Sequence, residues 1–291
     1  MSGMVVCIDL GGTKALCGIA KQGYIANVKR YPVPASSTKQ EVTDYVIELV
    51  RKTITTECIG IAIGIPGVVN SATGEVFEVT NIPAWRDVPL SKILCERFNV
   101  PVLVHNDVNC FTYGEYRYGE HGGNLTPCKN ILGVCLGTGL GAGVVIDKQL
   151  YTGRYGLAGE FGSAPYLGKT IEDYCSGQFF KQRGTDGELE YLSAKAGNVQ
   201  SLKLFEQLGT HLGIAFAHMQ LAYDPDVIVM GGSVTQAFDL FGERMFASFT
   251  QYEQCKQLNI RVSQLPHAAL LGAFALFEQK YKVVSPELDC I

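Results

Sequence analysis

Three runs of apolar residues each end in a glycine turn, and this recurring pattern limits the possible folds more than any other feature of the chain. The turns lie in IDLGGTK at 8–14, LGTGLGAG at 136–143 and VMGGSV at 229–234. Glycine lets a strand reverse sharply and leaves backbone N–H groups open to a negatively charged ligand. One such turn alone is typical of an ordinary β-hairpin, so the argument for a bound anion depends on all three together.

Strand-like and helix-like segments alternate along the chain. Apolar residues recur at helical spacing in 38–55 and 200–223, and residues 109–119 also have a helical pattern. The segments 130–136 and 142–146 are typical of a hairpin around the second glycine turn. This alternation predicts an α/β fold with mixed sheets. The length of 291 residues is sufficient for two lobes.

Composition excludes several classes of protein. The formal net charge is −4 and no long Lys/Arg run is present, unlike the basic surface of a nucleic-acid-binding protein. No apolar run approaches the roughly 18 residues of a membrane span, and the N-terminus lacks the regions of a signal peptide. We therefore expect a cytoplasmic protein with no nucleic-acid or membrane partner. The 10 cysteines are scattered without a CxxC pair, so we expect reduced core thiols.

Two common nucleotide-binding motifs are excluded. The glycine run at 136–143 is followed by strand-like residues at 144–146, whereas the dinucleotide fingerprint needs a helix there, and no P-loop motif occurs. Phosphoryl transfer needs a metal ion at the phosphates and a group that takes the proton of the acceptor. Asp9 and Asp107, each at the end of an apolar run, are the candidates for these roles. Either aspartate alone could equally be a turn or helix cap.

Six motifs in order resemble the ROK family (repressor, open reading frame, kinase) of sugar kinases over nearly the whole chain. They are DxGGTK (Asp9, Gly11, Gly12, Thr13, Lys14), GxPG (Gly64, Pro66, Gly67), NDxN (Asn106, Asp107, Asn109), GTGxG (Gly137, Thr138, Gly139, Gly141), AGExG (Ala158, Gly159, Glu160, Gly162) and a late GG turn (Gly231, Gly232). The order of the motifs makes the resemblance far more specific than any one of them.

The resemblance implies a two-lobed, actin-like ATPase (ribonuclease H-like) α/β fold with an interlobe cleft. The small domain would comprise residues 1–108 plus a C-terminal helix at about 273–291, and the large domain residues 109–272. The implied activity is that of an ATP-dependent sugar kinase, a phosphotransferase with an alcohol group as acceptor. MgATP and a hexose would be its ligands, and a homodimer is the assembly expected from its relatives.

The resemblance also assigns residue roles. Asp107 would be the general base for phosphorylation of a hexose at the 6-hydroxyl, and Asp9 would hold Mg²⁺ through water. The sugar would be bound by Gly67, Thr80, Asn81, Asn106, Asp107, Glu160 and Glu172. The nucleotide phosphates would face Gly11, Gly12, Thr13, Lys14, Thr138 and Gly139, with Gly231 and Gly232 in the late turn.

The chain departs from the family pattern at one place. The usual histidine after the AGExG glutamate is Ser163, and the shortened segment that follows lacks the three cysteines of the CxCGxxGC motif. We therefore expect no zinc site, because structural zinc needs about four nitrogen or sulfur ligands. Glu172 would then be held by packing, with Tyr166, Leu167 and Ile171 as candidates.

The identity of the sugar is left open by this departure. Glucose is the leading substrate, and N-acetylmannosamine, N-acetylglucosamine, allose and fructose are alternatives. A catalytically weak sugar sensor is a further alternative. A transcription regulator is disfavoured, because the first strand is expected to start at Met4 and leaves no room for a DNA-binding domain before it.

Overall fold

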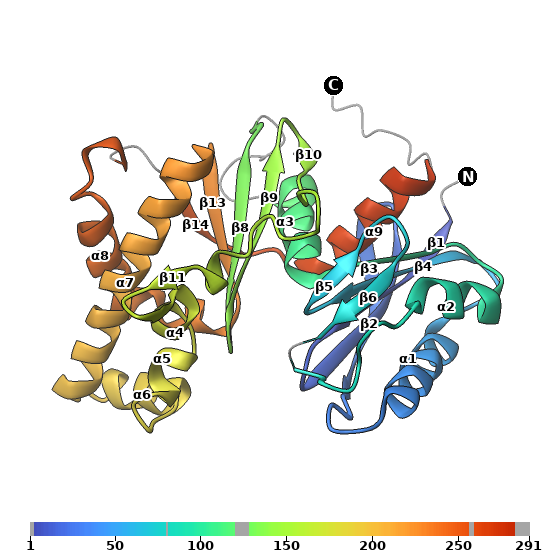
Figure 1. The fold of residues 1–291 in the computed structure, drawn as a ribbon, viewed down its shortest axis with the longest axis horizontal. Coiled ribbons are helices and arrows are strands. Elements are labelled where there is room, and N and C mark those ends of the chain that lie inside the picture. Colours follow the sequence, from blue (N-terminus) through green and yellow to red (C-terminus); the bar gives the residue numbers. More distant parts are fainter. Residues whose placement is uncertain (1–2, 80, 120–127, 256–258, 283–291) are drawn as a thin grey trace. The chain divides into compact units, whose positions relative to one another are not determined.

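The computed structural model describes residues 3–79, 81–119, 128–255 and 259–282, which form two compact units (Figure 1). Unit 1 comprises Met1–Thr126, Thr152–Ala158 and Gln264–Ile291, and unit 2 comprises Pro127–Tyr151 and Gly159–Ser263. Each unit is built around one five-stranded mixed sheet. None of the helices among the described residues combines the length and apolar character needed to cross a bilayer.

The sheet of unit 1 has the strand order β3-β2-β1-β4-β7. Its strands are β1 (Met4–Leu10), β2 (Lys14–Lys21), β3 (Tyr24–Pro32), β4 (Cys58–Ile65) and β7 (Val102–Asn106). Strand β2 runs antiparallel to both β1 and β3, whereas β1, β4 and β7 run parallel. A short hairpin of β5 (Val68–Asn70) and β6 (Glu75–Glu78) follows β4. The carboxyl ends of the three parallel strands therefore share one edge.

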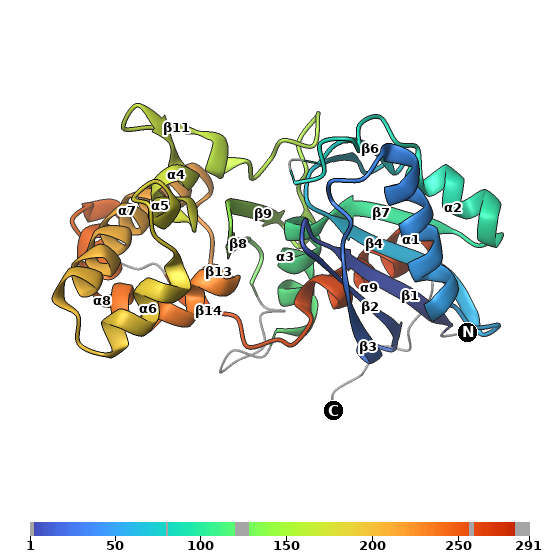
Figure 2. The same cartoon turned by 90° about the horizontal axis from the view of Figure 1, so that it is seen from below.

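Alternate residues of these strands serve opposite faces of the sheet. On one face, α1 (Lys39–Thr53) and α2 (Leu90–Phe98) bury an apolar core against the isoleucines of β4. On the other face lie α3 (Asp107–Tyr118) and α9 (Ala268–Tyr281), as Figure 2 shows. A Cβ atom on Gly60 would lie 2.0 Å from the Phe277 ring, so glycine is needed in β4 for α9 to pack there.

Helix α3 belongs to unit 1, whereas the sequence-based bounds assign its residues 109–118 to the large domain. Its close contact with α9 explains this placement. A Cβ atom on Gly272 would lie 1.7 Å from the carbonyl oxygen of Cys110, and one on Gly114 would lie 2.1 Å from that of Ala268. The two helices thus touch backbone to backbone, which fixes the start of α3 at the sheet edge.

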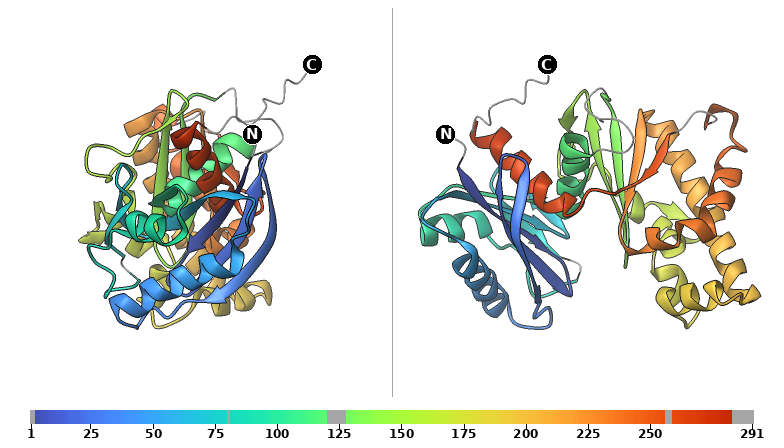
Figure 3. Two further views of the ribbon diagram at one scale, coloured as in Figure 1. Left: turned by 90° about the vertical axis from the view of Figure 1, so that its right-hand side faces the viewer. Right: turned by 180° about the vertical axis from the view of Figure 1, so that it is seen from behind.

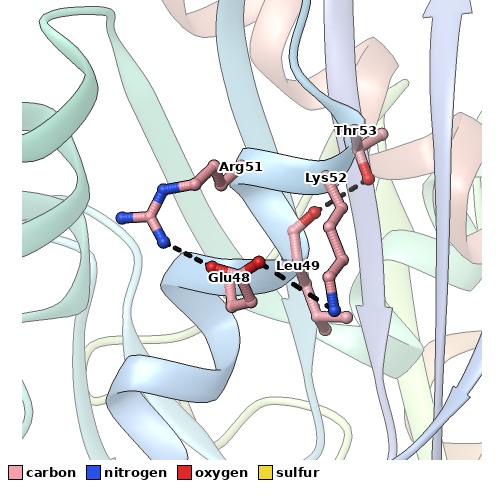
Figure 4. A network of polar contacts seen from close by, with 5 residues as sticks. All are labelled: Glu48, Leu49, Arg51, Lys52 and Thr53. Carbon is pink, nitrogen blue, oxygen red and sulfur yellow. Dashed lines mark hydrogen bonds and ion pairs between the residues drawn. The ribbon is translucent and has the colours of Figure 1, made fainter.

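The exposed face of α1 carries a small network of charges (Figure 4). Glu48 forms ion pairs with Arg51 and with Lys52, the latter at 3.9 Å. Exposed pairs of this kind contribute only about 0.3–0.5 kcal/mol each. The helix is held mainly by its buried valines and by Thr38, whose side chain accepts a hydrogen bond from the first turn. The predicted helix at 38–55 is confirmed.

Unit 2 repeats the strand order of unit 1, with β10-β9-β8-β13-β14. Its strands are β8 (Ile131–Leu136), β9 (Leu140–Ile146), β10 (Gln149–Leu150), β13 (Val227–Gly231) and β14 (Ile260–Val262). Strand β9 runs antiparallel to both β8 and β10, and β8, β13 and β14 run parallel. The turn between β8 and β9 therefore occupies the same place in its sheet as the turn between β1 and β2. The predicted hairpin around GTGLGAG is confirmed.

Helices cover one face of the second sheet and bury its apolar residues. They are α4 (Ile171–Cys175), α5 (Gln178–Lys181), α6 (Gly187–Lys195), α7 (Val199–Tyr223) and α8 (Phe238–Phe249), with the 3-10 turns η1 (Phe161–Ser163), η2 (Ser233–Ala237) and η3 (Glu253–Cys255) and the hairpin β11 (Pro165–Tyr166) and β12 (Lys169–Thr170). Helices α7 and α8 lie side by side (Figure 3) because Gly209 and Gly213 let their backbones approach. The long helix predicted at 200–223 is confirmed.

Candidate functional site

The carboxyl edge of the parallel strands in unit 1 brings the two predicted aspartates together. Asp9 in β1 pairs with Gly64 in β4, and a Cβ atom on Gly64 would lie 3.3 Å from the Cα of Asp107. Burial raises the pKa of the Cys110 thiol, and the charges of Asp107 and Asp9 raise it further. Both carboxylates therefore lie near one buried sulfur atom.

Asn106 ties the start of α3 to the turn after β4. Its side-chain oxygen accepts a hydrogen bond of 2.9 Å from the backbone N–H of Asn109, which makes it the N-cap of α3. Its amide nitrogen donates to the carbonyl oxygen of Gly67 at 3.2 Å. The next residue, Asp107, accepts from the N–H of Val108 at 2.9 Å. The first turn of a helix favours negative charge, so the Asp107 carboxylate is stabilised where it stands.

His105 lies on the opposite side of the strand end, within the protein. The backbone N–H of Asn106 donates to its Nδ1 atom at 2.9 Å, and burial lowers the pKa of the imidazole to about 4. The ring is therefore neutral at physiological pH. This agrees with an interior packing role rather than with a role as a base.

The first glycine turn contacts a second predicted sugar residue. The N–H of Gly11 donates to the carbonyl oxygen of Lys14 at 2.9 Å, which closes the turn between β1 and β2. A Cβ atom on Gly12 would lie 2.4 Å from the Cβ of Asn81, so only glycine allows this approach. The neighbouring Thr80, also predicted to bind sugar, lies outside the described residues.

Asp9 has the electrostatic character of a group that a cation would stabilise. Burial raises the pKa of its carboxyl to about 6, and the positive charge of Lys14 only partly opposes this rise. Within the part of the chain that the structure describes, no three side chains of His, Cys, Asp or Glu gather into a potential metal cluster.

In unit 2, the predicted glutamates lie beside the second glycine turn. One carboxylate oxygen of Glu172 accepts a hydrogen bond of 3.1 Å from the N–H of Leu140, and a Cβ atom on Gly139 would lie 2.5 Å from the same oxygen. Desolvation raises the pKa of Glu160, and the charge of Glu172 raises it further. Glu160 and Glu172 are thus neighbours. Ser163 lies between them in the sequence, in an exposed turn where its N–H donates to the carbonyl oxygen of Glu160 at 3.2 Å.

The second and third glycine turns lie against one another. Gly232 has a φ of 92°, and a Cβ atom there would lie 2.3 Å from the carbonyl oxygen of Leu136. This contact places the end of β13 beside the turn that contains Thr138. The backbone carbonyl of Thr138 accepts a hydrogen bond of 3.2 Å from the buried hydroxyl of Ser176.

A cavity of about 460 Å³ opens from these two turns and is closed on other sides by helices of unit 2. Gly137, Thr138 and Ser233 line one part of it. The remaining wall is formed by aromatic, charged and amide side chains, of which the main ones are Phe180, Lys181, Asp186, Glu188, Tyr191, Phe205 and Gln236. Its size and mixture of apolar and polar walls suit a small organic ligand with a charged end.

Sequence reasoning found the turns but missed most of this wall. Gly139, Gly231 and Gly232 do not line the cavity, although Gly139 and Gly232 each adjoin a lining residue in the chain. The aromatic and charged residues come from α5, from α7, and from α6 with its N-cap Asp186, while η2 contributes Gln236. None of these segments carries a motif that marks it for a ligand. In the sequence, only the position of these lining residues in amphipathic segments after the glycine turns could have indicated a role in the cavity.

Two sheets with the same strand order, each with a glycine turn at its first hairpin, define an actin-like ATPase fold. Within this class the chain belongs to the ROK family, whose sequence model matches residues 5–280. The resemblance inferred from the motifs and the predicted fold class are both confirmed.

Named relatives are similar over most of the chain. A glucokinase of Streptomyces coelicolor is 27% identical over 286 residues, covering 86% of this chain and 88% of the relative. An N-acetyl-D-glucosamine kinase of Vibrio parahaemolyticus is 30% identical over 277 residues, with 84% and 88% covered. A ROK family glucokinase from Streptomyces griseus, solved in complex with glucose and AMPPNP, superimposes with a TM-score of 0.80 at 26% identity, covering 94% and 99%. Xylose repressors of Caldicellulosiruptor also match.

Proposed function

We propose that this protein is an ATP-dependent hexose kinase that phosphorylates the sugar at its 6-hydroxyl, with Asp107 as the general base. The observation that carries the proposal is the position of Asp107 at the carboxyl edge of the parallel strands, where Asn106 ties it to Gly67. The family and the kinase relatives support the same reaction. The chain would therefore be a transferase of carbohydrate metabolism.

The chemical step needs few groups. The oxygen of the sugar hydroxyl forms a bond to the γ-phosphorus while the bond from that phosphorus to the β–γ bridging oxygen breaks, and ADP leaves. The proton of the hydroxyl passes to the Asp107 carboxylate. Because this proton is lost late in a loose transition state, an aspartate of ordinary basicity is sufficient. Asn106 would orient the sugar beside the base, with Gly67 and Asn81 at the adjoining wall.

The cavity of unit 2 is the proposed nucleotide site. Thr138 and Ser233 offer hydroxyl and backbone donors of the kind that bind phosphate oxygens. The partly exposed ring of Tyr191 offers an apolar surface that suits a purine ring, whereas Phe180 and Phe205, which border the cavity, are almost fully buried. Gly11, Gly12, Thr13 and Lys14 would complete the phosphate contacts. Glu160 and Glu172 would accept hydrogen bonds from sugar hydroxyls.

A magnesium ion fits the properties of Asp9. A partly desolvated carboxyl whose pKa is raised to about 6 gains from a nearby divalent cation, which Asp9 would hold through water. When bound with ATP, the ion neutralises phosphate charge that develops during transfer. Lys14, beside Asp9, would orient the same phosphates.

The sugar is proposed to be glucose, with N-acetylglucosamine, N-acetylmannosamine, allose and fructose as the alternatives. Relatives named as glucokinases and as N-acetyl-D-glucosamine kinases match at similar identity. Ser163 and Glu172 occupy the region where this chain departs from the family pattern, so discrimination near C1 and C2 cannot be transferred from either relative. A coupled assay with ATP and a panel of these sugars decides among them.

The base is tested by the variant Asp107→Asn, which keeps the shape of the side chain and removes its basicity. Turnover should fall by about 10²–10⁴-fold, while sugar affinity measured by calorimetry should change little, because the base acts in the transition state. Asp44→Asn, on the exposed face of α1 in the same unit, is the matched control and should retain full turnover. Normal turnover of Asp107→Asn would contradict the assignment.

A further inference from the structure

The helical segment that carries Glu172 is too short to be stable by itself. Helix α4 has 5 residues and follows a hairpin whose turn, Leu167 and Gly168, has φ angles of 47° and 79°. Such a short helix is unstable alone, so its position must come from contacts with the rest of unit 2. Asp173 caps its start by accepting hydrogen bonds from the N–H and the hydroxyl of Thr170, at 2.9 and 2.6 Å.

A histidine of the long helix α7 forms the centre of these contacts. The hydroxyl of Tyr166, in the hairpin, lies 3.1 Å from Nδ1 of His211. The ring of Tyr174, in α4, lies 4.9 Å from the imidazole and 5.3 Å from the ring of Tyr166. Tyr174 also donates its hydroxyl hydrogen to the carbonyl oxygen of Leu167 at 3.0 Å. Hairpin, α4 and α7 therefore meet at His211.

The charge states of these groups suit a neutral hydrogen bond. Desolvation lowers the pKa of His211, and the positive charge of Arg183 lowers it further. Burial raises the pKa of Tyr166 to about 12. At neutral pH the phenol keeps its proton and the imidazole is uncharged, so Tyr166 can donate to an unprotonated Nδ1.

We propose that Tyr166 and His211 form a latch that positions α4 and thereby aims the Glu172 carboxylate at the sugar. The proposal rests on the sugar-binding role proposed above for Glu172. Ile171 and Cys175 bury one side of α4 in the core, and the Glu172 carboxylate reaches the N–H of Leu140 from the same short helix. The Tyr166–His211 latch thus adds a directed contact where sequence analysis expected packing alone. Both are positioning residues, since neither touches the proposed ligands.

The variant Tyr166→Phe tests the latch, because it keeps the ring and removes the hydroxyl. The KM for the sugar should rise about fivefold, as expected for one lost neutral hydrogen bond, while kcat at saturating sugar changes less than about twofold. Tyr281→Phe is the matched control in unit 1, where the hydroxyl donates to the carbonyl oxygen of Val102 at 2.9 Å. It should leave the sugar KM unchanged. An unchanged sugar KM in Tyr166→Phe would overturn the proposal.

Substitutions of His211 test whether the two residues act as a pair. His211→Ala should match Tyr166→Phe, and the double variant should be no worse than either single variant. His211→Asn, whose side-chain oxygen can take the place of Nδ1 as the acceptor for the phenol, should recover most of the loss in sugar KM. Additive losses, or no recovery with asparagine, would mean a general packing effect and would overturn the latch.

Hydrogen exchange separates failure of the latch from failure of the proposed function. If the wild-type protein phosphorylates and binds none of the sugars, the proposed function is wrong. The latch still predicts faster exchange of the Leu140 amide in Tyr166→Phe, because this N–H donates to Glu172. Unchanged exchange at Leu140 would overturn the latch whatever the activity.

Discussion

The backbone N–H of Leu140 donates a hydrogen bond of 3.1 Å to the carboxylate of Glu172, which links the second glycine turn to helix α4. The single hydroxyl hydrogen of Ser176 adds to this link, because it is shared between the backbone carbonyl oxygens of Glu172 at 2.7 Å and of Thr138 at 3.2 Å. A residue proposed to bind sugar therefore touches the turn proposed to bind phosphate. Sugar contacts at Glu172 and phosphate contacts at this turn should influence each other.

Removing the charge of Glu172 should change the pH dependence of sugar binding through Glu160. The Glu172 charge contributes to the raised pKa of Glu160, so Glu172→Gln should lower that pKa. In the proposed site, an ionised Glu160 would accept stronger hydrogen bonds from sugar hydroxyls than a protonated one, and the acid-side rise in sugar KM should therefore move to lower pH. The sugar KM measured from about pH 5 to pH 8 checks this. Glu206→Gln, an exposed change on α7, should leave the profile unmoved.

Two glycines of the cavity region should respond differently to an added methyl group. Gly137 lines the cavity, and a Cβ atom there would meet nothing within 4 Å. Gly137→Ala should fold normally but raise the KM for ATP about tenfold, because the methyl group occupies space proposed for the nucleotide. An ATP KM equal to that of the wild type would remove Gly137 from the proposed site.

Gly232→Ala should instead damage folding. Its φ of 92° is strained for alanine, and the new Cβ atom would lie 2.3 Å from the carbonyl oxygen of Leu136. We expect a loss of about 2–4 kcal/mol in the free energy of unfolding. Thermal unfolding of the two variants side by side checks the contrast, and equal melting temperatures would show that the contact can relax.

The negative charge of Asp9 should destabilise the ligand-free protein at pH 7, so an uncharged side chain at this position should stabilise it. The pKa of Asp9 is about 6 in the folded protein against 3.8 for an unperturbed side chain, so the folded state holds this proton more tightly. The stabilising effect is complete below about pH 4 and is lost as pH rises through about 6. Asp9→Asn should therefore add about 2 kcal/mol at pH 7 and nothing at pH 4, while it abolishes activity.

Unfolding curves at both pH values, measured without nucleotide, check the Asp9 prediction. Asp44→Asn is the control, because it makes the same change at an exposed position of the same unit. A gain in stability at pH 7 that persists at pH 4 would mean that the introduced amide improves packing and that burial of charge is not the cause.

The sequence marks those parts of the candidate site that lie at sharp turns or at junctions between a strand and a helix. The turns at Gly12 and Gly232 are visible because only glycine tolerates the contacts with Asn81 and with Leu136. Asp107 is visible because it ends an apolar strand and starts a helix. These features are local, so residues that are close in the sequence are sufficient to predict them.

The rest depends on contacts between distant segments. Tyr166 and His211 are 45 residues apart, and no spacing rule relates them. The placement of α3 in unit 1 depends on Gly114 meeting α9, where a single glycine in a helical pattern gives no sign of its partner. The aromatic wall of the cavity, including Tyr191, has the same origin. Such features follow from packing that only the folded chain defines.

The single tryptophan of the chain anchors the segment that carries Asn81. Trp85 is fully buried, and its indole N–H donates to the hydroxyl of Thr43 in α1 at 3.0 Å. Thr43→Val keeps the shape of the side chain but leaves this indole N–H without its acceptor. We expect a loss of about 1–3 kcal/mol in the free energy of unfolding. The sugar KM should rise too, because Asn81 packs against Gly12 and a shift of the segment that carries Asn81 would disturb this contact.

Thr53→Val provides the control for this last change. Both threonines donate to the carbonyl oxygen four residues earlier at 2.8 Å, and Figure 4 draws the bond from Thr53 to Leu49. Only Thr43 also accepts from the indole of Trp85. The difference between the two variants in unfolding energy and sugar KM therefore isolates the contact of Thr43 with Trp85, whose fluorescence reports unfolding directly. If the two variants behave alike, the indole does not hold the Asn81 segment in place.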